Sequence, residues 1–413
     1  MLRIHDWRTG TSGEIAVGRA LRMHACVPSV DGRPRLGELR PLLVADLVRR
    51  VLERGRVRVV ACCPRSLGPG ASSDVGGERD AADLNVRPAE HAPLPDETVA
   101  LALRLVETLV EKGHAYVVPG GTVFFAAGTY PGLSVGTTGD ASRGAGDASP
   151  GGAGSGEEVE GRRSPADWVL WRPAGAEPSW ESPWGRGVPG PHVACSAVPL
   201  GLLGGRVDVH VGPDGPDGAR VERERAQSDA AAGHEVVRHW VGTAEVSFGD
   251  RPADDGAGEA MTPPLSTPTD THPHTGTPPS TPTDTHLDAG TSLSDVVQAG
   301  LDPLAVRMAF LEHHYRRPIG LTWDVLRAAD RAARHWRRRV AQWSESPSAP
   351  MAAEYVKRVE AALDDDLDTP AALRVLRELE DDASVSPGAR FEAFLHVDQV
   401  LGLDLSGDIG KGL

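Results

Sequence analysis

The residues from His24 to Arg40, HACVPSVDGRPRLGELR, contain the side chains that a nucleotide-activating loop uses. A cysteine and a later glycine and arginine stand between an apolar run and a helical pattern, which is where parallel α/β proteins bind phosphate at a helix N-terminus. The stretch has no histidine after His24, and the acid Glu38 stands near the expected phosphate position. The residues therefore predict the frame of a nucleotide site whose phosphate-binding chemistry has changed.

The elements that would position this stretch form a βαβ unit. Residues 21–27, LRMHACV, and residues 56–63, RVRVVACC, are apolar runs of strand length. Between them, residues 41–54 place apolar side chains on one helical face, with Pro41 at the start and Gly55 just past the end. This order predicts half of a doubly wound α/β nucleotide-binding sheet.

Composition limits the class of protein. The 413 residues are 40% hydrophobic and 24% charged, which predicts two or three folded domains. The formal net charge of −15 excludes a globally basic nucleic-acid binder, so any such contact would need a local basic face. The four cysteines are too few for a disulfide scaffold, and no apolar run approaches the ~20 residues of a membrane span. We therefore expect a cytoplasmic protein without a membrane partner.

The rest of the chain alternates patterned and low-complexity segments. Further elements are expected as a helix at 95–113, a helix at 192–203, a strand at 206–211 and a helix at 220–233. Residues 251–289 repeat STPTDTH in a Pro/Thr-rich tract, which predicts disorder. Helices follow after residue 290, and the helix at 368–380 is expected to have Thr369 as its N-cap and Pro370 as its first residue.

Several separated segments resemble cysteinyl-tRNA synthetase, a class I aminoacyl-tRNA synthetase. The most specific is DWVLWRPAGAEPSWESPWGRGVPGPHVACSAV at 167–198. Others are DLNVRPAEHAPLP (83–95), ETLVEKGHAYVV (107–118), AQSDAAAG (226–233), DPLAVRMAFLEHHYRRPIGLTWD (302–324) and LDDDLDTPAALRVL (363–376). The resemblance implies an α/β fold: a Rossmann-like class I catalytic domain with an inserted connective segment, followed by a C-terminal helical bundle.

The resemblance also implies a domain plan. The two halves of the catalytic domain would be residues 1–82 and 165–250, separated by a connective insertion (83–135) and a flexible linker (136–164). The Pro/Thr-rich segment (251–289) would replace the loop that carries the family's KMSKS motif. A helical stem-contact region (290–345) and a helical bundle (346–405) would follow, and the family's anticodon-reading module is not matched.

Members of this family activate cysteine with ATP, as cysteinyl-adenylate, and transfer the acyl group to tRNA. The family selects the thiol with zinc, which suits a thiolate ligand. The resemblance places Cys26, Cys195 and Glu224 at ligand positions, but Arg220 stands where the family has a histidine. Arginine cannot ligate a metal, so either zinc recruits His192 or His210, or Arg220 and Glu224 form an i, i+4 ion pair beside two apolar cysteines.

Two phosphate motifs of the family are changed. The HIGH motif aligns with Arg35, Leu36, Gly37 and Glu38; Gly37 and Arg40 match the family, whereas both histidines are lost. The KMSKS motif should follow residues 246–250, and the chain has no lysine from residue 113 to 356. By resemblance, Gly37, Arg40 and His210 are the nucleotide-binding candidates. Arg35 could still contact phosphate, but Glu38 would repel it, so the sequence favours an ordinary turn whose arginines and Glu38 are solvated.

Three functions follow from the resemblance. The chain could be a divergent cysteine–tRNA ligase, a ligase that joins cysteine to a small amine as in mycothiol synthesis, or a paralogue with little or no catalysis. Because both phosphate motifs and the zinc histidine are changed together, we expect an impaired or inactive paralogue. ATP and cysteine are the expected ligands, and the arginine-rich stretch 327–339 offers a surface for tRNA or simply a solvated helix face. We expect a monomer.

Overall fold

The computed structural model describes residues 1–16, 18–26, 34–65, 75–133, 161–213, 219–249 and 287–411. The predicted linker at 136–164 and the Pro/Thr-rich segment at 251–289 lie outside these residues, apart from the last few positions of each. None of the described helices is both long and apolar enough to cross a membrane.

The centre of the molecule is a parallel sheet in the order β10-β9-β3-β4. Its strands are β3 (Leu21–Ala25), β4 (Val59–Cys62), β9 (Val207–Pro213) and β10 (Val237–Thr243). Helix α1 (Leu36–Arg54) connects β3 to β4, which confirms the predicted βαβ unit. A short hairpin, β1 (Arg3–Asp6) and β2 (Thr11–Glu14), lies beside β10.

Helix α1 begins five residues earlier than the apolar pattern predicts, so Pro41 lies inside the helix. Two contacts extend its start. The backbone N–H of Leu36 donates to the carbonyl of Thr291 at 3.0 Å, and the backbone N–H of Arg35 donates to Glu38 Oε2 at 2.8 Å. Such contacts satisfy amides that a helix N-terminus otherwise leaves open. The expectation that Pro41 opens the helix was therefore wrong, because a distant segment supplies the cap.

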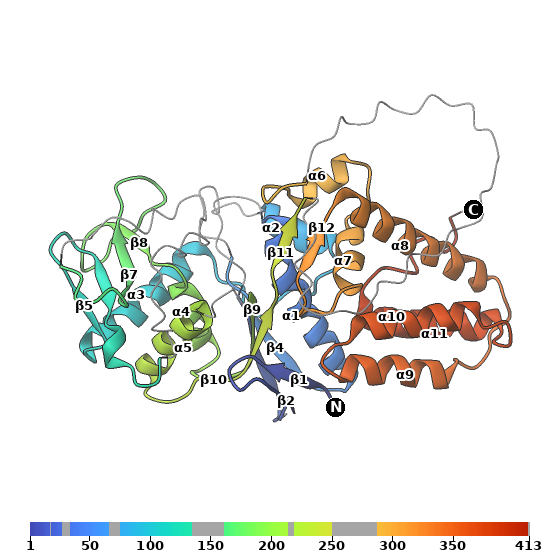
Figure 1. Ribbon diagram of the computed structural model, residues 1–413, viewed down its shortest axis with the longest axis horizontal. Coiled ribbons are helices and arrows are strands. Elements are labelled where there is room, and N and C mark those ends of the chain that lie inside the picture. Colours follow the sequence, from blue (N-terminus) through green and yellow to red (C-terminus); the bar gives the residue numbers. More distant parts are fainter. Residues whose placement is uncertain are drawn as a thin grey trace.

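A lobe on one side of the sheet combines helices with a second, antiparallel sheet (Figure 1). Its strands are β5 (Ala115–Val117), β6 (Val123–Phe125), β7 (Trp168–Pro173) and β8 (Gly187–Pro189). Its helices are α3 (Pro95–Glu111), α4 (Val193–Leu202) and α5 (Ala219–Ala232), and α4 packs against both of the others. These helices confirm the predictions at 95–113, 192–203 and 220–233 within a few residues. The short helix α2 (Val75–Asp83) precedes them in the chain.

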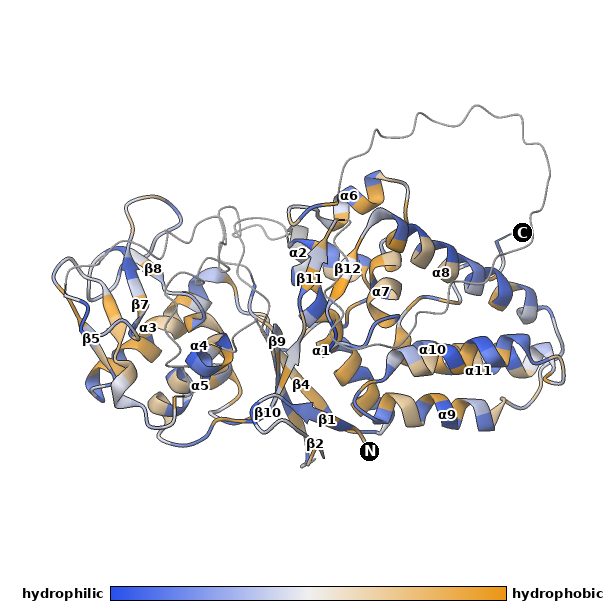
Figure 2. Cartoon of the chain, in the orientation of Figure 1, coloured by the Kyte–Doolittle hydropathy of each residue, from blue (hydrophilic) through white to orange (hydrophobic). Residues whose placement is uncertain are grey.

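The other side of the sheet carries a helical region, coloured orange to red in Figure 1. Its helices are α6 (Leu293–Gln298), α7 (Leu304–Leu311), α8 (Trp323–Ser344), α9 (Ala353–Asp364), α10 (Thr369–Asp381) and α11 (Pro387–Leu401). Strands β11 (Val246–Phe248) and β12 (Ile319–Leu321) pair in parallel near its start. Helices α8 to α11 carry both apolar and polar residues along their length (Figure 2), as helices with one buried face do.

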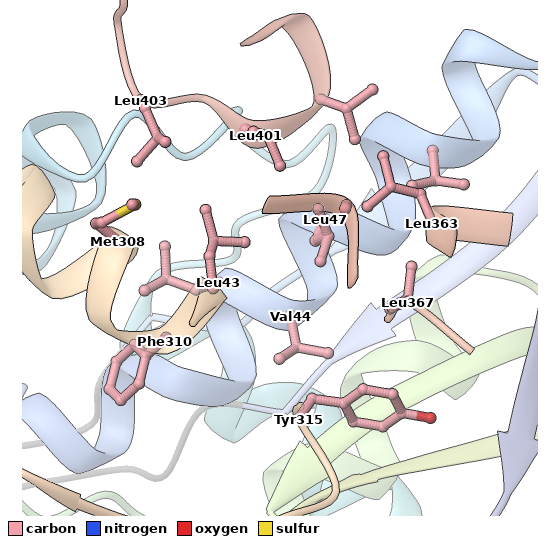
Figure 3. Close-up of a cluster of buried hydrophobic side chains, with 14 of the residues drawn as sticks. Leu43, Val44, Leu47, Met308, Phe310, Tyr315, Leu363, Leu367, Leu401 and Leu403 are labelled. Carbon is pink, nitrogen blue, oxygen red and sulfur yellow. The ribbon is translucent and has the colours of Figure 1, made fainter. Parts of the chain in front are cut away.

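One apolar core joins the central sheet to this helical region. Leu43, Val44 and Leu47 of α1 face Met308 and Phe310 of α7, together with leucines at the ends of α9 and α11 (Figure 3). The side chains of this cluster are almost completely buried. The helical region is therefore packed directly on the helix that follows the first strand of the sheet.

Candidate active site

The residues predicted to bind a metal do come together at the carboxyl end of β3. Cys26 follows that strand, Cys195 lies on α4 and Glu224 lies on α5. Their sulfur and carboxylate atoms all lie within 4.8 Å of one another, and all three side chains are buried. The site forms because α4 and α5 pack on each other beside the sheet edge where the strands end.

Arg220 lies within this group rather than apart from it. Its Nε is 3.0 Å from Glu224 Oε1, and one terminal nitrogen is 2.9 Å from Cys26 Sγ and 4.0 Å from Cys195 Sγ. Positions 220 and 224 share one face of α5 because residues four apart are neighbours on a helix. The predicted i, i+4 ion pair between Arg220 and Glu224 is thus confirmed.

Glu224 supplies the carboxylate of the site and contacts three cationic or polar side chains. Besides Arg220, it has His210 Nε2 at 3.0 Å from Oε2 and His192 Nδ1 at 3.6 Å from Oε1. Burial alone would raise the pKa of this carboxyl, but the contact with His210 and the charge of Arg220 outweigh burial and lower the pKa to about 2. Glu224 is therefore an anion at neutral pH and already has cationic and polar partners.

His24 belongs to the same site and was not predicted. It is fully buried, its Nδ1 is 3.2 Å from the carbonyl of Cys62, and its ring centroid is 5.0 Å from that of His210. Burial first, and then the neighbouring His210, lowers the pKa of His24 to about 3, so it is neutral. The sequence held a signal for it, because His24 and Cys26 are two residues apart in the predicted strand at 21–27 and would share a face.

The resemblance implies a zinc ion here, and the residues present do not fit one. Zinc takes thiolate, imidazole and carboxylate ligands at about 2.0 to 2.3 Å in a tetrahedron. In this chain Cys26 and Cys195 are joined as a disulfide, which removes both thiolates. The guanidinium of Arg220 also contacts Cys26, Cys195 and Glu224 together, so a cationic side chain lies against all three would-be donors.

The residues aligned with the HIGH motif lie at the start of α1. The Glu38 carboxylate faces the backbone N–H of Arg35, and burial raises its pKa. The Arg35 guanidinium is 3.5 Å from the carbonyl of Ala289. A Cβ on Gly37 would lie 3.5 Å from Val246 and Phe248 of β11, so this glycine packs against protein. Intramolecular groups thus surround the helix start.

Arg40 is buried and hydrogen-bonded to backbone carbonyls of other segments. Its two terminal nitrogens donate to the carbonyls of Ala244, Glu245, His314 and Arg317 at 2.7 to 3.2 Å. The residue is 1% exposed, and burial lowers its pKa to about 10. The nucleotide-binding candidates Gly37, Arg40 and His210 therefore have three separate environments: a packing contact with β11, a set of backbone carbonyls, and the Glu224 site.

Comparison with known proteins identifies the family. Residues 76–252 match the tRNA synthetases class I (C) catalytic domain. The cysteine–tRNA ligase of Alkalilimnicola ehrlichii is 31% identical over 402 residues, covering 89% of this chain and 78% of the relative. That of Pseudomonas aeruginosa is 30% identical over 402 residues, covering 92% and 78%.

The fold has solved counterparts as well. Mycobacterium tuberculosis methionyl-tRNA synthetase bound by methionyl-adenylate superposes with a TM-score of 0.50 at 11% identity, covering 93% of this chain and 92% of that one. This likeness confirms the class I catalytic fold, with its parallel sheet and following helical region. On the sequence identities and their coverage, the chain belongs to the cysteine–tRNA ligase family of class I tRNA synthetases.

Proposed function

We propose that this chain keeps the cysteine-activating framework of its family but is an impaired or inactive paralogue in the ATP-dependent step. The observation that carries the proposal is the start of α1. There the Glu38 carboxylate accepts a hydrogen bond from the backbone N–H of Arg35, and the carbonyl of Thr291 accepts one from the backbone N–H of Leu36. These amides and the helix dipole are what a helix N-terminus offers to phosphate.

The charge at this helix start also opposes ATP. A triphosphate approaching α1 would meet the carboxylate of Glu38 instead of the two histidines of the family motif. The lysines of the second motif are not replaced by other lysines either, since none occurs from residue 113 to 356. Groups that stabilise developing charge each contribute roughly 3 kcal/mol to such steps, so losing two sets predicts a rate at least about a thousandfold lower.

The test is cysteine-dependent exchange of pyrophosphate into ATP by the full chain. The Pseudomonas aeruginosa cysteine–tRNA ligase, assayed in parallel, provides the positive control. We expect exchange at least about a thousandfold slower than the control, because the phosphate contacts are replaced by the chain's own groups. Exchange at a rate comparable to that of the control would refute the proposal.

A further inference from the structure

The further inference concerns the group of side chains around Arg220 and is independent of the phosphate contacts at α1. Cys26, Cys195 and Glu224 converge as metal donors would, with their ligand atoms within 4.8 Å of one another. Exposed acidic clusters often have such spacing by chance, but these three side chains are buried. A buried carboxylate such as Glu224 needs a positive partner, and so would the two thiolates once the disulfide between Cys26 and Cys195 is reduced.

Arg220 is that partner in this structure. Its guanidinium reaches Glu224 Oε1 at 3.0 Å, Cys26 Sγ at 2.9 Å and Cys195 Sγ at 4.0 Å. One cation therefore contacts all three donors, as a metal ion at their centre would. The Arg220 side chain is 19% exposed and Glu224 is 2% exposed, so the guanidinium closes the site from its outer side.

A metal ion would have to displace this cation. A zinc ion bonded to these donors would sit about 2.0 to 2.3 Å from each of them, and the guanidinium already contacts the same three atoms at 2.9 to 4.0 Å. If Arg220 stayed close by, its fixed positive charge would repel the ion across a few ångströms of poorly screened interior. Arginine stays charged in proteins and has no lone pair to offer, so it competes with a metal and cannot bind one.

We propose that Arg220 is the resident cation of this site in place of a metal ion, and that in the reduced chain, where the disulfide no longer withholds both thiolates, Arg220 by itself excludes zinc. Arg220 already lies against both sulfurs. A histidine at position 220 would stay on the same helix face as Glu224. Its neutral imidazole would add a fourth ligand to the two thiolates and the carboxylate. Arg220→His is therefore sufficient to create a zinc site from Cys26, Cys195, Glu224 and the new imidazole.

The site offers one competing donor set, which the experiment must separate. His24, Cys26 and His210 also have ligand atoms within 4.8 Å of one another. The Nε2 atom of His24 is buried without a hydrogen-bond partner, so it could face an ion. A metal bound there would share the Cys26 sulfur that Arg220 contacts, but its other two ligands would be the imidazoles of His24 and His210, so His24→Asn would remove it.

The experiment measures zinc bound to the reduced full chain. Wild type, Arg220→His and Arg223→His are reduced, incubated with a small excess of zinc and desalted, and zinc is quantified by mass spectrometry. Arg223→His is the matched control, since it makes the same change on the same helix but at a side chain that lies 5.9 Å over the ring of Trp168. We expect about one zinc per chain for Arg220→His and essentially none for the other two.

Cobalt binding then locates the ion. Cobalt in Arg220→His should give the absorption bands of thiolate ligands in a tetrahedral site, and adding Cys26→Ser should weaken zinc binding by more than about a hundredfold, because a direct ligand contributes more than a supporting residue does. If Arg220→His does not fold, Arg220→Ala provides the second test. It removes the cation without adding a ligand, and we expect its zinc affinity to lie above that of wild type.

Two results would overturn the proposal. One is a full equivalent of zinc bound to the reduced wild type. This holds whether the zinc is lost on His24→Asn, which removes a ligand of the competing donor set, or remains bound. Another is folded Arg220→His that binds no more zinc than Arg223→His. Both readouts are metal contents and do not involve ATP, so they stand apart from the exchange assay. Since the α1 start is unchanged, Arg220→His should take up zinc without gaining exchange activity.

Discussion

At the scale of single residues, the family pattern and the structure assign different partners to the same side chain. Arg40 matches the family position beside the HIGH motif, and from sequence it was a candidate for nucleotide binding. Its guanidinium instead donates to four backbone carbonyls. Two lie just before β11 and two lie in the segment after α7. The contact joins α1 to two segments more than two hundred residues later in the chain.

Replacing Arg40 with lysine tests this structural role. A single ammonium cannot reproduce the planar fork that serves four carbonyls, so buried acceptors are left without donors. We expect the free energy of unfolding, from urea titration, to fall by about 2 kcal/mol or more. Arg22→Lys, at an exposed position on β3, should change it by less than about 0.5 kcal/mol. Unchanged stability together with weaker ATP binding would instead assign Arg40 to the nucleotide.

At the scale of elements, the sequence located most helices but misplaced some ends. Helix α10 illustrates the reason. The pattern predicted Thr369 as N-cap, whereas Asp368 holds that position and its carboxylate accepts the backbone N–H of Ala371 at 3.0 Å. Both residues are good caps, and only the backbone path into the helix decides between them.

A pair of substitutions distinguishes the two caps. Asp368→Ala should lower the free energy of unfolding by about 1 kcal/mol, because it removes the acceptor for an open helix amide. Thr369→Val keeps the shape of the side chain and removes only the hydroxyl, so we expect a smaller effect. Thermal unfolding followed by circular dichroism measures both. If Thr369→Val lowered the free energy of unfolding more than Asp368→Ala does, Thr369 and not Asp368 would be the N-cap.

At the scale of the whole molecule, a buried ion pair joins α1, the helix between β3 and β4, to the helical region. Asp46 Oδ2 of α1 lies 2.6 Å from a terminal nitrogen of Arg307 on α7 and 2.7 Å from Nε of Arg50. Arg307 also donates to the carbonyl of Leu401 at the end of α11. With the apolar cluster around Leu43 and Phe310, this network makes the two regions one packed unit.

Asp46→Asn should therefore destabilise the whole chain. Removing one partner leaves the Arg307 charge buried and unpaired, so we expect a loss of about 3 to 5 kcal/mol at pH 7. Asp324→Asn, at a side chain that is 93% exposed, is the matched control and should change stability by less than about 1 kcal/mol. An equally small change for Asp46→Asn would show that the network does not join the two regions.

The same pair has a pH dependence. Burial would raise the pKa of Asp46, but the charges of Arg307 and Arg50 outweigh it and hold the pKa below its ordinary value of 3.8. A lowered pKa adds stability above the unfolded value, and this is lost as pH falls below it. The stability difference between wild type and Asp46→Asn, from urea titrations, should be constant near pH 7 and shrink below about pH 4. A difference independent of pH would contradict this assignment.

The sequence alone determined the family, the βαβ unit, the position of most helices and the four residues around the would-be metal site. These follow from local periodicity and from motifs that need no knowledge of the fold. The tertiary structure decided what those residues do. It placed Arg220 on the metal donors, gave Arg40 four carbonyls, brought His24 into the site and let Thr291 cap α1. Each of these depends on segments far apart in the chain, and the free energy of burying a charge or an amide depends on the partner that meets it.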